Sequence, residues 1–125
     1  MGTHRPSKHV AIDFGTKKMG LAWLEENEIK TLPFKVAQTE EVFRAISPAV
    51  AHTEIQGNLP EWFSKLAATH NIRLIKVKPN DVRIEGNGVT KGKWLKRAIV
   101  QQHTSCPNGD CYDAAYVLLN FLGRV

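Results

Sequence analysis

One stretch near the N-terminus, residues 10–24, limits the folds open to this chain more than any other. It holds an apolar run that ends at Asp13, a turn bounded by Gly15 and Gly20, and a second apolar run. Glycine has no Cβ atom, so it permits a tight turn and a close approach of backbone or phosphate. The stretch predicts a β-hairpin. Because a carboxylate at the end of a buried strand is costly without a cationic partner, Asp13 either hydrogen-bonds its own turn or binds Mg²⁺ or Mn²⁺.

The rest of the chain alternates between strand-like and helix-like patterns. Further strands are predicted at 20–25, 29–36, 49–55 and 72–78, after a first strand at 9–15. Helices are predicted from the N-cap Thr39 to Ser47, and at about 59–70, 89–103 and 110–122.

The connections between these elements predict the sheet. Short turns make the first three strands an antiparallel meander, and helical crossovers bring the fourth and fifth strands parallel to the first. Pro33 cannot donate to a strand ladder, so the third strand should lie at an edge or carry a bulge. We therefore expect an α/β fold with a mixed five-stranded sheet and helices on both faces.

Length and charge limit the class of protein. A chain of 125 residues is sufficient for one domain, and we expect a short polar arm at 1–8 and a single domain at 9–125. No stretch approaches the roughly 18 to 20 apolar residues of a membrane span, and residues 1–8 lack the apolar core of a signal peptide. We expect a cytoplasmic protein without membrane contact. Its net charge of +5 moderately favours a polyanionic partner.

Four acidic residues stand where the predicted elements could bring them together. Glu54 ends the fourth strand, which should run parallel to the strand that ends at Asp13, and ligands bind beyond the carboxyl ends of such strands. Asp110 and Asp113 are spaced i, i+3 on one face of the last helix. Individually, Glu54 could point to water and the two aspartates could serve as helix-terminal acids.

Taken together, the four carboxylates predict a site for two divalent cations. Like charges this close disfavour ionisation unless a cation lies between them. Two metal ions about 3.5 to 4 Å apart stabilise the attacking and leaving oxygens of a phosphoryl displacement. Such a site requires no serine, cysteine or histidine nucleophile, and the sequence shows no such triad.

These motifs together resemble the RuvC family, the Holliday junction resolvases of the RNase H-like superfamily. The similarity runs in order through residues 9–122. Its motifs are Ile12-Asp13-x-Gly15-Thr16-x-x-x-Gly20-x-Ala22, the strand glutamate Glu54, Gly86-x-Gly88-x-x-Lys91, and Asp110-x-x-Asp113-Ala114.

The resemblance implies a metal-dependent endonuclease that cuts four-way DNA junctions as a homodimer and leaves 5′ phosphates. Its catalytic metal ligands would be Asp13, Glu54, Asp110 and Asp113, holding two Mg²⁺ or Mn²⁺ ions. Lys91 would match a lysine that contacts the scissile region. The chain is shorter between these acids than typical cellular resolvases, and the family's dimer relies partly on helices in those intervals. A compact version would suit a phage or mobile-element enzyme, and the expected location is the cytoplasm of a prokaryotic cell or a phage-infected host.

Two alternatives remain open. The segment Asp13-Phe14-Gly15-Thr16-Lys17 also resembles the YqgF branch of the superfamily, which is linked to pre-ribosomal RNA processing. The Asp110-x-x-Asp113 pair and the two-glycine loop fit resolvases better. The second alternative is a module that binds junctions and does not cut them, although none of the four acids is missing.

DNA would be held mainly through its phosphates, which position an enzyme without reading sequence. The candidates are Lys17, Lys18, Arg83, Lys91, Lys93, Lys96 and Arg97. The last four of these could instead form an ordinary solvated helix face, although Lys91 is set apart from that alternative because it follows the two-glycine loop.

Overall fold

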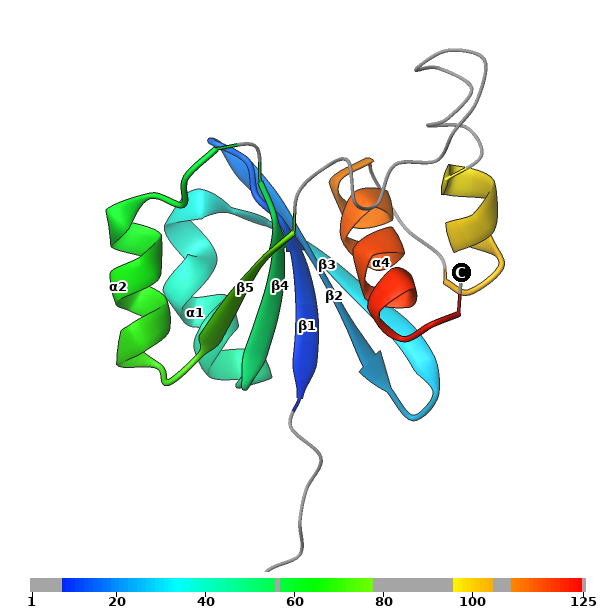
Figure 1. Cartoon of the computed structure of the whole chain (residues 1–125), viewed down its shortest axis with the longest axis horizontal. Coiled ribbons are helices and arrows are strands. Elements are labelled where there is room, and N and C mark those ends of the chain that lie inside the picture. Colours follow the sequence, from blue (N-terminus) through cyan, green and yellow to red (C-terminus); the bar gives the residue numbers. More distant parts are fainter. Residues whose placement is uncertain (1–7, 56, 78–95, 105–108, 125) are drawn as a thin grey trace, which may run out of the picture.

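A five-stranded sheet with the strand order β3-β2-β1-β4-β5 forms the centre of the molecule (Figure 1). The computed structural model describes residues 8–55, 57–77, 96–104 and 109–124. The central strand β1 pairs antiparallel with β2 and parallel with β4, as predicted. The strands are β1 (His9–Asp13), β2 (Lys18–Glu25), β3 (Glu28–Lys35), β4 (Val50–Glu54) and β5 (Arg73–Val77).

The strand β3 lies at one edge of the sheet, which agrees with its proline. Pro33 stands opposite Gly20 of β2, and among the described residues β3 has no other strand neighbour. An edge strand tolerates a residue that cannot donate to the ladder. The mixed sheet predicted from the sequence is thus confirmed, including the edge position of its third strand.

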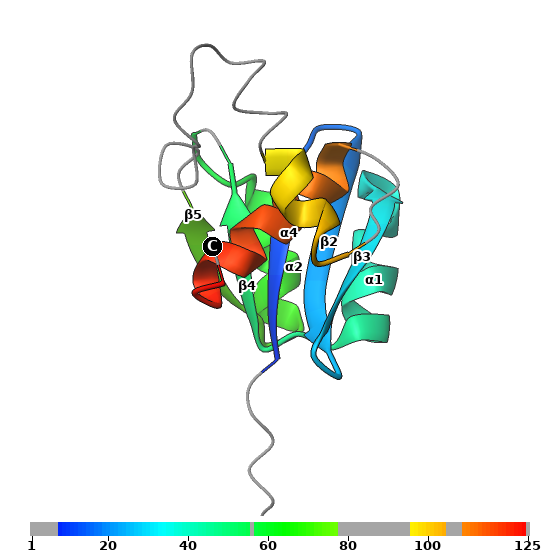
Figure 2. The same cartoon turned by 90° about the vertical axis from the view of Figure 1, so that its right-hand side faces the viewer.

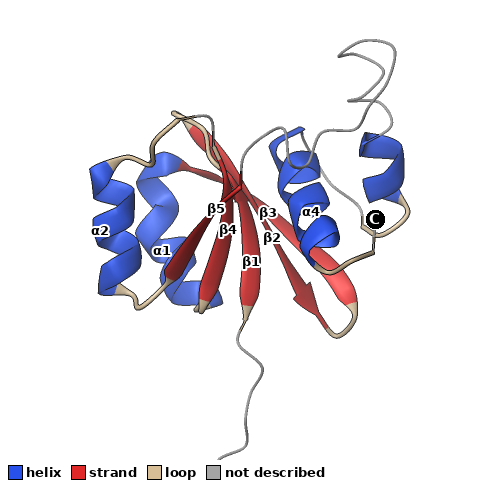
Figure 3. Cartoon of the chain, in the orientation of Figure 1, coloured by secondary structure: helices blue, strands red, loops and turns tan. Residues whose placement is uncertain are grey.

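Helices cover both faces of the sheet (Figures 2 and 3). One face carries α1 (Thr39–Ile46) and α2 (Glu61–Thr69). The other face carries α4 (Gly109–Phe121), beside which residues 96–101 form a further helical segment. No helix within the described residues is both long enough and apolar enough to cross a bilayer.

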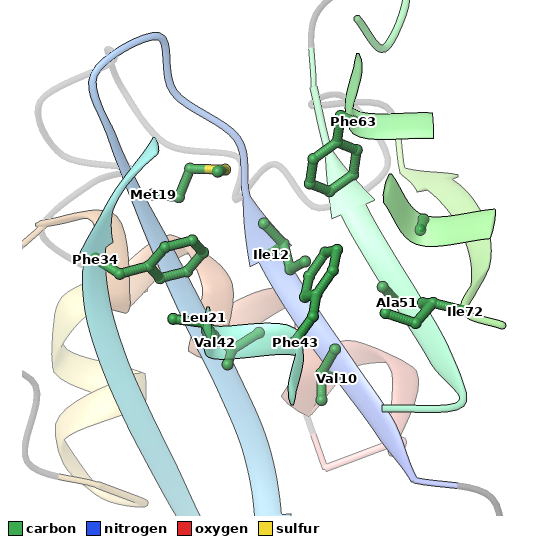
Figure 4. Packing of buried hydrophobic residues seen from close by; sticks show 11 residues of the cluster. Val10, Ile12, Met19, Leu21, Phe34, Val42, Phe43, Ala51, Phe63 and Ile72 are labelled. Atoms are coloured by element: carbon green, nitrogen blue, oxygen red, sulfur yellow. The ribbon is translucent and has the colours of Figure 1, made fainter. Parts of the chain in front are cut away.

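The core on the α1 and α2 face contains the larger side chains (Figure 4). Val10 and Ile12 of β1 pack there against Phe43 of α1 and Phe63 of α2. The rings of Phe43 and Phe63 meet edge to face, with their centroids 5.8 Å apart. These large side chains fill the layer between the sheet and the helix pair.

The core on the α4 face contains alanines from both the sheet and the helix, together with larger residues such as Leu118. Ala11 of β1 and Ala22 of β2 share a buried cluster with Ala114 and Ala115 of α4. Alanines on both sides allow a helix backbone to approach a sheet closely, because little side-chain volume separates them. This packing fixes α4 over β1 and β2.

The start of α1 differs from the prediction. A short 3₁₀ helix, η1 (Val36–Gln38), precedes α1, and Gln38 is the N-cap where Thr39 was predicted. Thr39 is buried inside the first turn, and its hydroxyl donates to the carbonyl of Val36 at 2.6 Å. The 3₁₀ turn continues into α1, so the helical backbone begins before Thr39 and the prediction of a Thr39 cap was wrong.

Other element boundaries shift by a few residues. The strand β1 ends at Asp13, two residues earlier than predicted. The predicted helix at 89–103 falls within the described residues only from residue 96 onward, where 96–101 are helical. Residues 1–7 lie outside the described part of the chain, so the division into an arm and one domain stays a prediction.

Candidate active site

Two carboxylates stand side by side at the ends of neighbouring parallel strands. Asp13 of β1 pairs in register with Glu54 of β4. The N–H of Phe14 donates to the carbonyl of Glu54 at 3.2 Å, which continues the ladder past Asp13. Residues paired in this way direct their side chains to the same face of the sheet. The backbone ladder therefore fixes the spacing of these two acids.

The face on which both acids lie is the one covered by α4. Ala11, two residues before Asp13, belongs to the core cluster under α4, and side chains alternate between faces along a strand. On the other flank, Asp13 is paired with Gly20 of β2, which has no side chain. Asp13 and Glu54 therefore open toward the first turns of α4.

The helix α4 brings a third acid to this place. Asp113 follows the first turn of α4, and it lies close enough to Glu54 to affect the ionisation of that group. Asp110 is in the first turn of the same helix, one turn before Asp113, but its side chain lies outside the described part of the structure. The structure thus pairs Asp13 with Glu54 and places Asp113 near Glu54, and the role of these acids as metal ligands stays a prediction.

A lysine from a distant segment completes the cluster. The Nζ atom of Lys96 is 3.3 Å from Oδ1 of Asp113, and the Lys96 side chain is only 15% exposed. The same Nζ atom lies 5.2 Å from the centroid of the Tyr116 ring on α4. Lys96 is therefore part of the acidic site, where the sequence had suggested a helix face that binds DNA or points to water.

The electrostatics of the site centre on Glu54. Burial raises the pKa of the Glu54 carboxyl above its ordinary value, nearby Lys96 counteracts this rise, and Asp113 adds to it. The Oε2 atom of Glu54 is buried and has no hydrogen-bond partner among the described residues. A buried carboxylate oxygen without a partner is unfavourable, so this position would gain from a bound cation.

The residues fit a divalent cation by their chemistry. Carboxylate oxygens are the preferred protein ligands of Mg²⁺ and Mn²⁺, and the Oε2 atom of Glu54 is available as a ligand. Within the described ranges, no three His, Cys, Asp or Glu side chains already form a group able to hold a metal ion. The side chain of Asp110 is not among the described ones. Ion binding would therefore require Asp110, a side-chain adjustment, or both.

The predicted basic residues are only partly described. Lys17 and Lys18 are exposed at the turn between β1 and β2, a few residues after the end of β1 at Asp13. Arg97 is exposed, with its Cζ atom 5.4 Å from the centroid of the Tyr112 ring. The candidates outside the described residues are Arg83, Lys91 and Lys93.

One feature of the sequence is consistent with the inward position of Lys96. Lys96 and Val100 are spaced i, i+4 and so share one helix face. Val100 is fully buried in the core cluster under α4. The buried Val100 indicates that Lys96 also faces α4. No local pattern, however, indicates Asp113 as its partner, because the two are separated by a further segment of chain.

Solved structures with the same fold are known, although they share little sequence with this chain. Thermus thermophilus RuvC in complex with a Holliday junction substrate is 14% identical with a TM-score of 0.59, and a second structure of that RuvC is 16% identical with a TM-score of 0.61. Both alignments cover 94% of this chain and 95% of the RuvC chain.

The solved structure of a viral protein is similar in fold as well. Fowlpox virus resolvase, in a complex with substrate Holliday junction DNA, is 16% identical with a TM-score of 0.50 over 92% of this chain and 98% of its own. No protein-family model matches the sequence, and neither does any curated protein. The chain has a RuvC-like RNase H fold, which confirms the predicted fold class.

Proposed function

We propose that this protein is a structure-specific endodeoxyribonuclease that resolves four-way (Holliday) or branched DNA junctions by metal-dependent phosphodiester hydrolysis. One observation carries the proposal. Asp13 and Glu54 are held in register at adjacent strand ends, and Asp113 of α4 lies near Glu54. The RuvC-like fold supports it, because solved neighbours with this fold are complexes with Holliday junction DNA.

The acids would act as ligands rather than as proton donors. Asp13, Glu54 and Asp113, together with Asp110, would hold two Mg²⁺ or Mn²⁺ ions. Such ions lower the pKa of bound water and stabilise the departing 3′ oxygen, which gives a 5′-phosphate product. Burial of Glu54 limits water around the site and strengthens electrostatic interactions there. Lys91 would contact the scissile region.

The surroundings of the site suit a phosphate backbone. The exposed Lys17 and Lys18 follow the turn after Asp13 and would contact DNA phosphates close to the cut. Arg97, with Arg83 and Lys93, would extend this basic surface. Two copies would act as a homodimer in the cytoplasm and cut two strands of one junction.

Removing one carboxylate charge tests the proposed site. Asp13→Asn or Asp113→Asn should lower cleavage of a labelled four-way junction in Mg²⁺ by about a hundredfold or more, because even outer partners of metal ligands change activity by about 10- to 100-fold. Junction binding, measured by gel shift in EDTA, should persist. Glu25→Gln, an exposed acid at the end of β2, is the matched control and should cut normally. Normal cleavage by either aspartate variant would show that the site is wrongly assigned.

The choice of substrate needs a separate experiment. The wild-type protein should be incubated with labelled four-way junctions, flaps, linear duplexes and structured RNA, each in Mg²⁺ and in Mn²⁺. Symmetrical cuts in the junction are expected. Cleavage of RNA alone would favour a YqgF-like activity, and binding without any cleavage would favour a junction-binding module.

A further inference from the structure

An ammonium group is fixed inside the acidic cluster. Lys96 is held by its ion pair with Asp113 at 3.3 Å and by the Tyr116 ring, whose centroid lies 5.2 Å from Nζ. Lysine side chains on a surface keep much rotamer freedom, whereas this one is packed to 15% exposure. Such a position is unusual for a lysine whose only role is to remain solvated.

The charge of this lysine offsets repulsion between the acids. Asp113 lies near Glu54, and the Nζ atom of Lys96 is 3.3 Å from Oδ1 of Asp113. Two neighbouring carboxylates are costly to ionise without a positive charge between or beside them. In the absence of a bound metal ion, Lys96 supplies that positive charge.

The same charge opposes a divalent cation. A positive group beside the ligands repels an incoming metal ion, and its pairing with Asp113 occupies an oxygen that the ion would use. We propose that Lys96 is a positioning residue that serves as the built-in counter-ion of Glu54 and Asp113 and gives up its ion pair when a divalent cation binds. This inference rests on the cation site of the proposed function.

Binding of Mn²⁺ without DNA tests the inference without any activity measurement. Lys96→Met keeps a side chain of similar length for packing on Tyr116 and removes the charge. It should bind Mn²⁺ about tenfold more tightly than the wild type, because one unit of repulsion is removed close to the site. Affinity is measured from the spectrum of free Mn²⁺ by electron paramagnetic resonance. Lys96→Arg keeps the charge and should return the affinity toward that of the wild type.

The neighbouring residue supplies a matched control. Arg97→Met makes the same change in net charge one position along the chain, but Arg97 is exposed and lies over Tyr112, with no ion pair to Asp113 in the described structure. Its Mn²⁺ affinity should equal that of the wild type. If Lys96→Met and Arg97→Met change the affinity equally, the effect is one of overall charge and the inference is wrong.

A double-mutant cycle in EDTA tests the ion pair when no metal ion is present. Lys96→Met should lower the Tm more in the wild-type background than in the Asp113→Asn background, because the partner is already lost there. Additive changes would overturn the counter-ion role.

The outcomes also separate this inference from the proposed function. If the wild type binds Mn²⁺ through Asp13, as shown by weaker binding in Asp13→Asn, but Lys96→Met does not bind it more tightly, only the Lys96 inference fails. If the wild type and Asp13→Asn both fail to bind Mn²⁺, the cation site itself fails, and the inference fails with it.

Discussion

Glu54 carries its carboxylate in surroundings that favour the neutral acid. Its Oε2 atom is buried without a hydrogen-bond partner among the described residues, and burial is the largest cause of its raised pKa. A buried charge that is only partly compensated destabilises a fold. Glu54 therefore lowers the stability of the metal-free protein, a pattern typical of residues placed for function.

Replacement of Glu54 by a neutral isostere should reveal this cost as a pH-dependent change in stability. The pKa of Glu54 in the folded protein lies above its ordinary value of 4.5. At a pH below 4.5, the protonated Glu54 therefore contributes its full stabilisation of the fold. This contribution is lost as the pH rises through the folded pKa. Glu54→Gln mimics the protonated acid. In EDTA, it should raise the Tm at about pH 8 and change it little at about pH 4.

Thermal melts monitored by circular dichroism at both pH values provide the measurement. The exposed Glu25→Gln on β2 is the control and should change the Tm little at either pH, as surface substitutions usually do. A Glu54→Gln protein that is less stable than the wild type at about pH 8 would contradict the interpretation.

At the scale of elements, the turn between β1 and β2 has little tolerance for added atoms. A Cβ atom placed on Gly15 would lie 2.1 Å from the carbonyl oxygen of Lys18, which is a backbone atom and cannot move like a flexible side chain. The turn is also tied to η1, because the N–H of Val36 donates to the carbonyl of Lys17 at 3.0 Å. Gly15 is therefore required by a close backbone approach.

Gly15→Ala should consequently destabilise the protein by about 1 to 3 kcal/mol, the usual cost of forcing extra volume into a packed position. Urea denaturation measures the change in the free energy of unfolding. Gly57→Ala is a useful comparison, because nothing lies within 4 Å of its added Cβ, although its φ of +96° makes alanine strained there. If Gly15→Ala were as stable as the wild type, the turn would have room that the structure does not show.

The elements differ in how far the sequence predicts them. Short connections and the proline signal of Pro33 were sufficient to predict which strands run antiparallel or parallel to β1 and that β3 could lie at an edge, because these depend on local geometry. The N-cap of α1 was misplaced, because the 3₁₀ turn of η1 can be recognised only once the backbone before Thr39 is known. Pairing of Lys96 with Asp113 depends on how two separate helices meet on the sheet, and no local pattern contains that information.

At the scale of the whole molecule, two cores of different character hold the layers together. Aromatic and branched side chains join the sheet to α1 and α2, whereas the core between the sheet and α4 includes alanines on both sides. The first core includes the fully buried Phe63 and the buried Phe43 (Figure 4). The second holds the helix that carries Asp113 close to the strands that carry Asp13 and Glu54.

Loss of one large side chain from the first core should therefore destabilise the whole fold. Phe63 is fully buried, and Phe63→Ala should lower the free energy of unfolding by about 3 to 5 kcal/mol. Its neighbour Trp62 on the same helix is 42% exposed, and Trp62→Ala should cost much less. Chemical denaturation of both variants gives the comparison. Equal losses for the two would show that α2 is not packed on the sheet in this way.

The ladder between β1 and β4 also determines where the chain can change in length. Asp13 and Glu54 are aligned by paired backbones, so the number of residues between them does not set their separation. Insertions or deletions in the turns around β3 and α1 leave the two carboxylates adjacent. A slip of one residue within β4, by contrast, would turn Glu54 to the opposite face. Relatives of this fold can therefore diverge widely in size and sequence, and alignments among them are best anchored on these two paired positions.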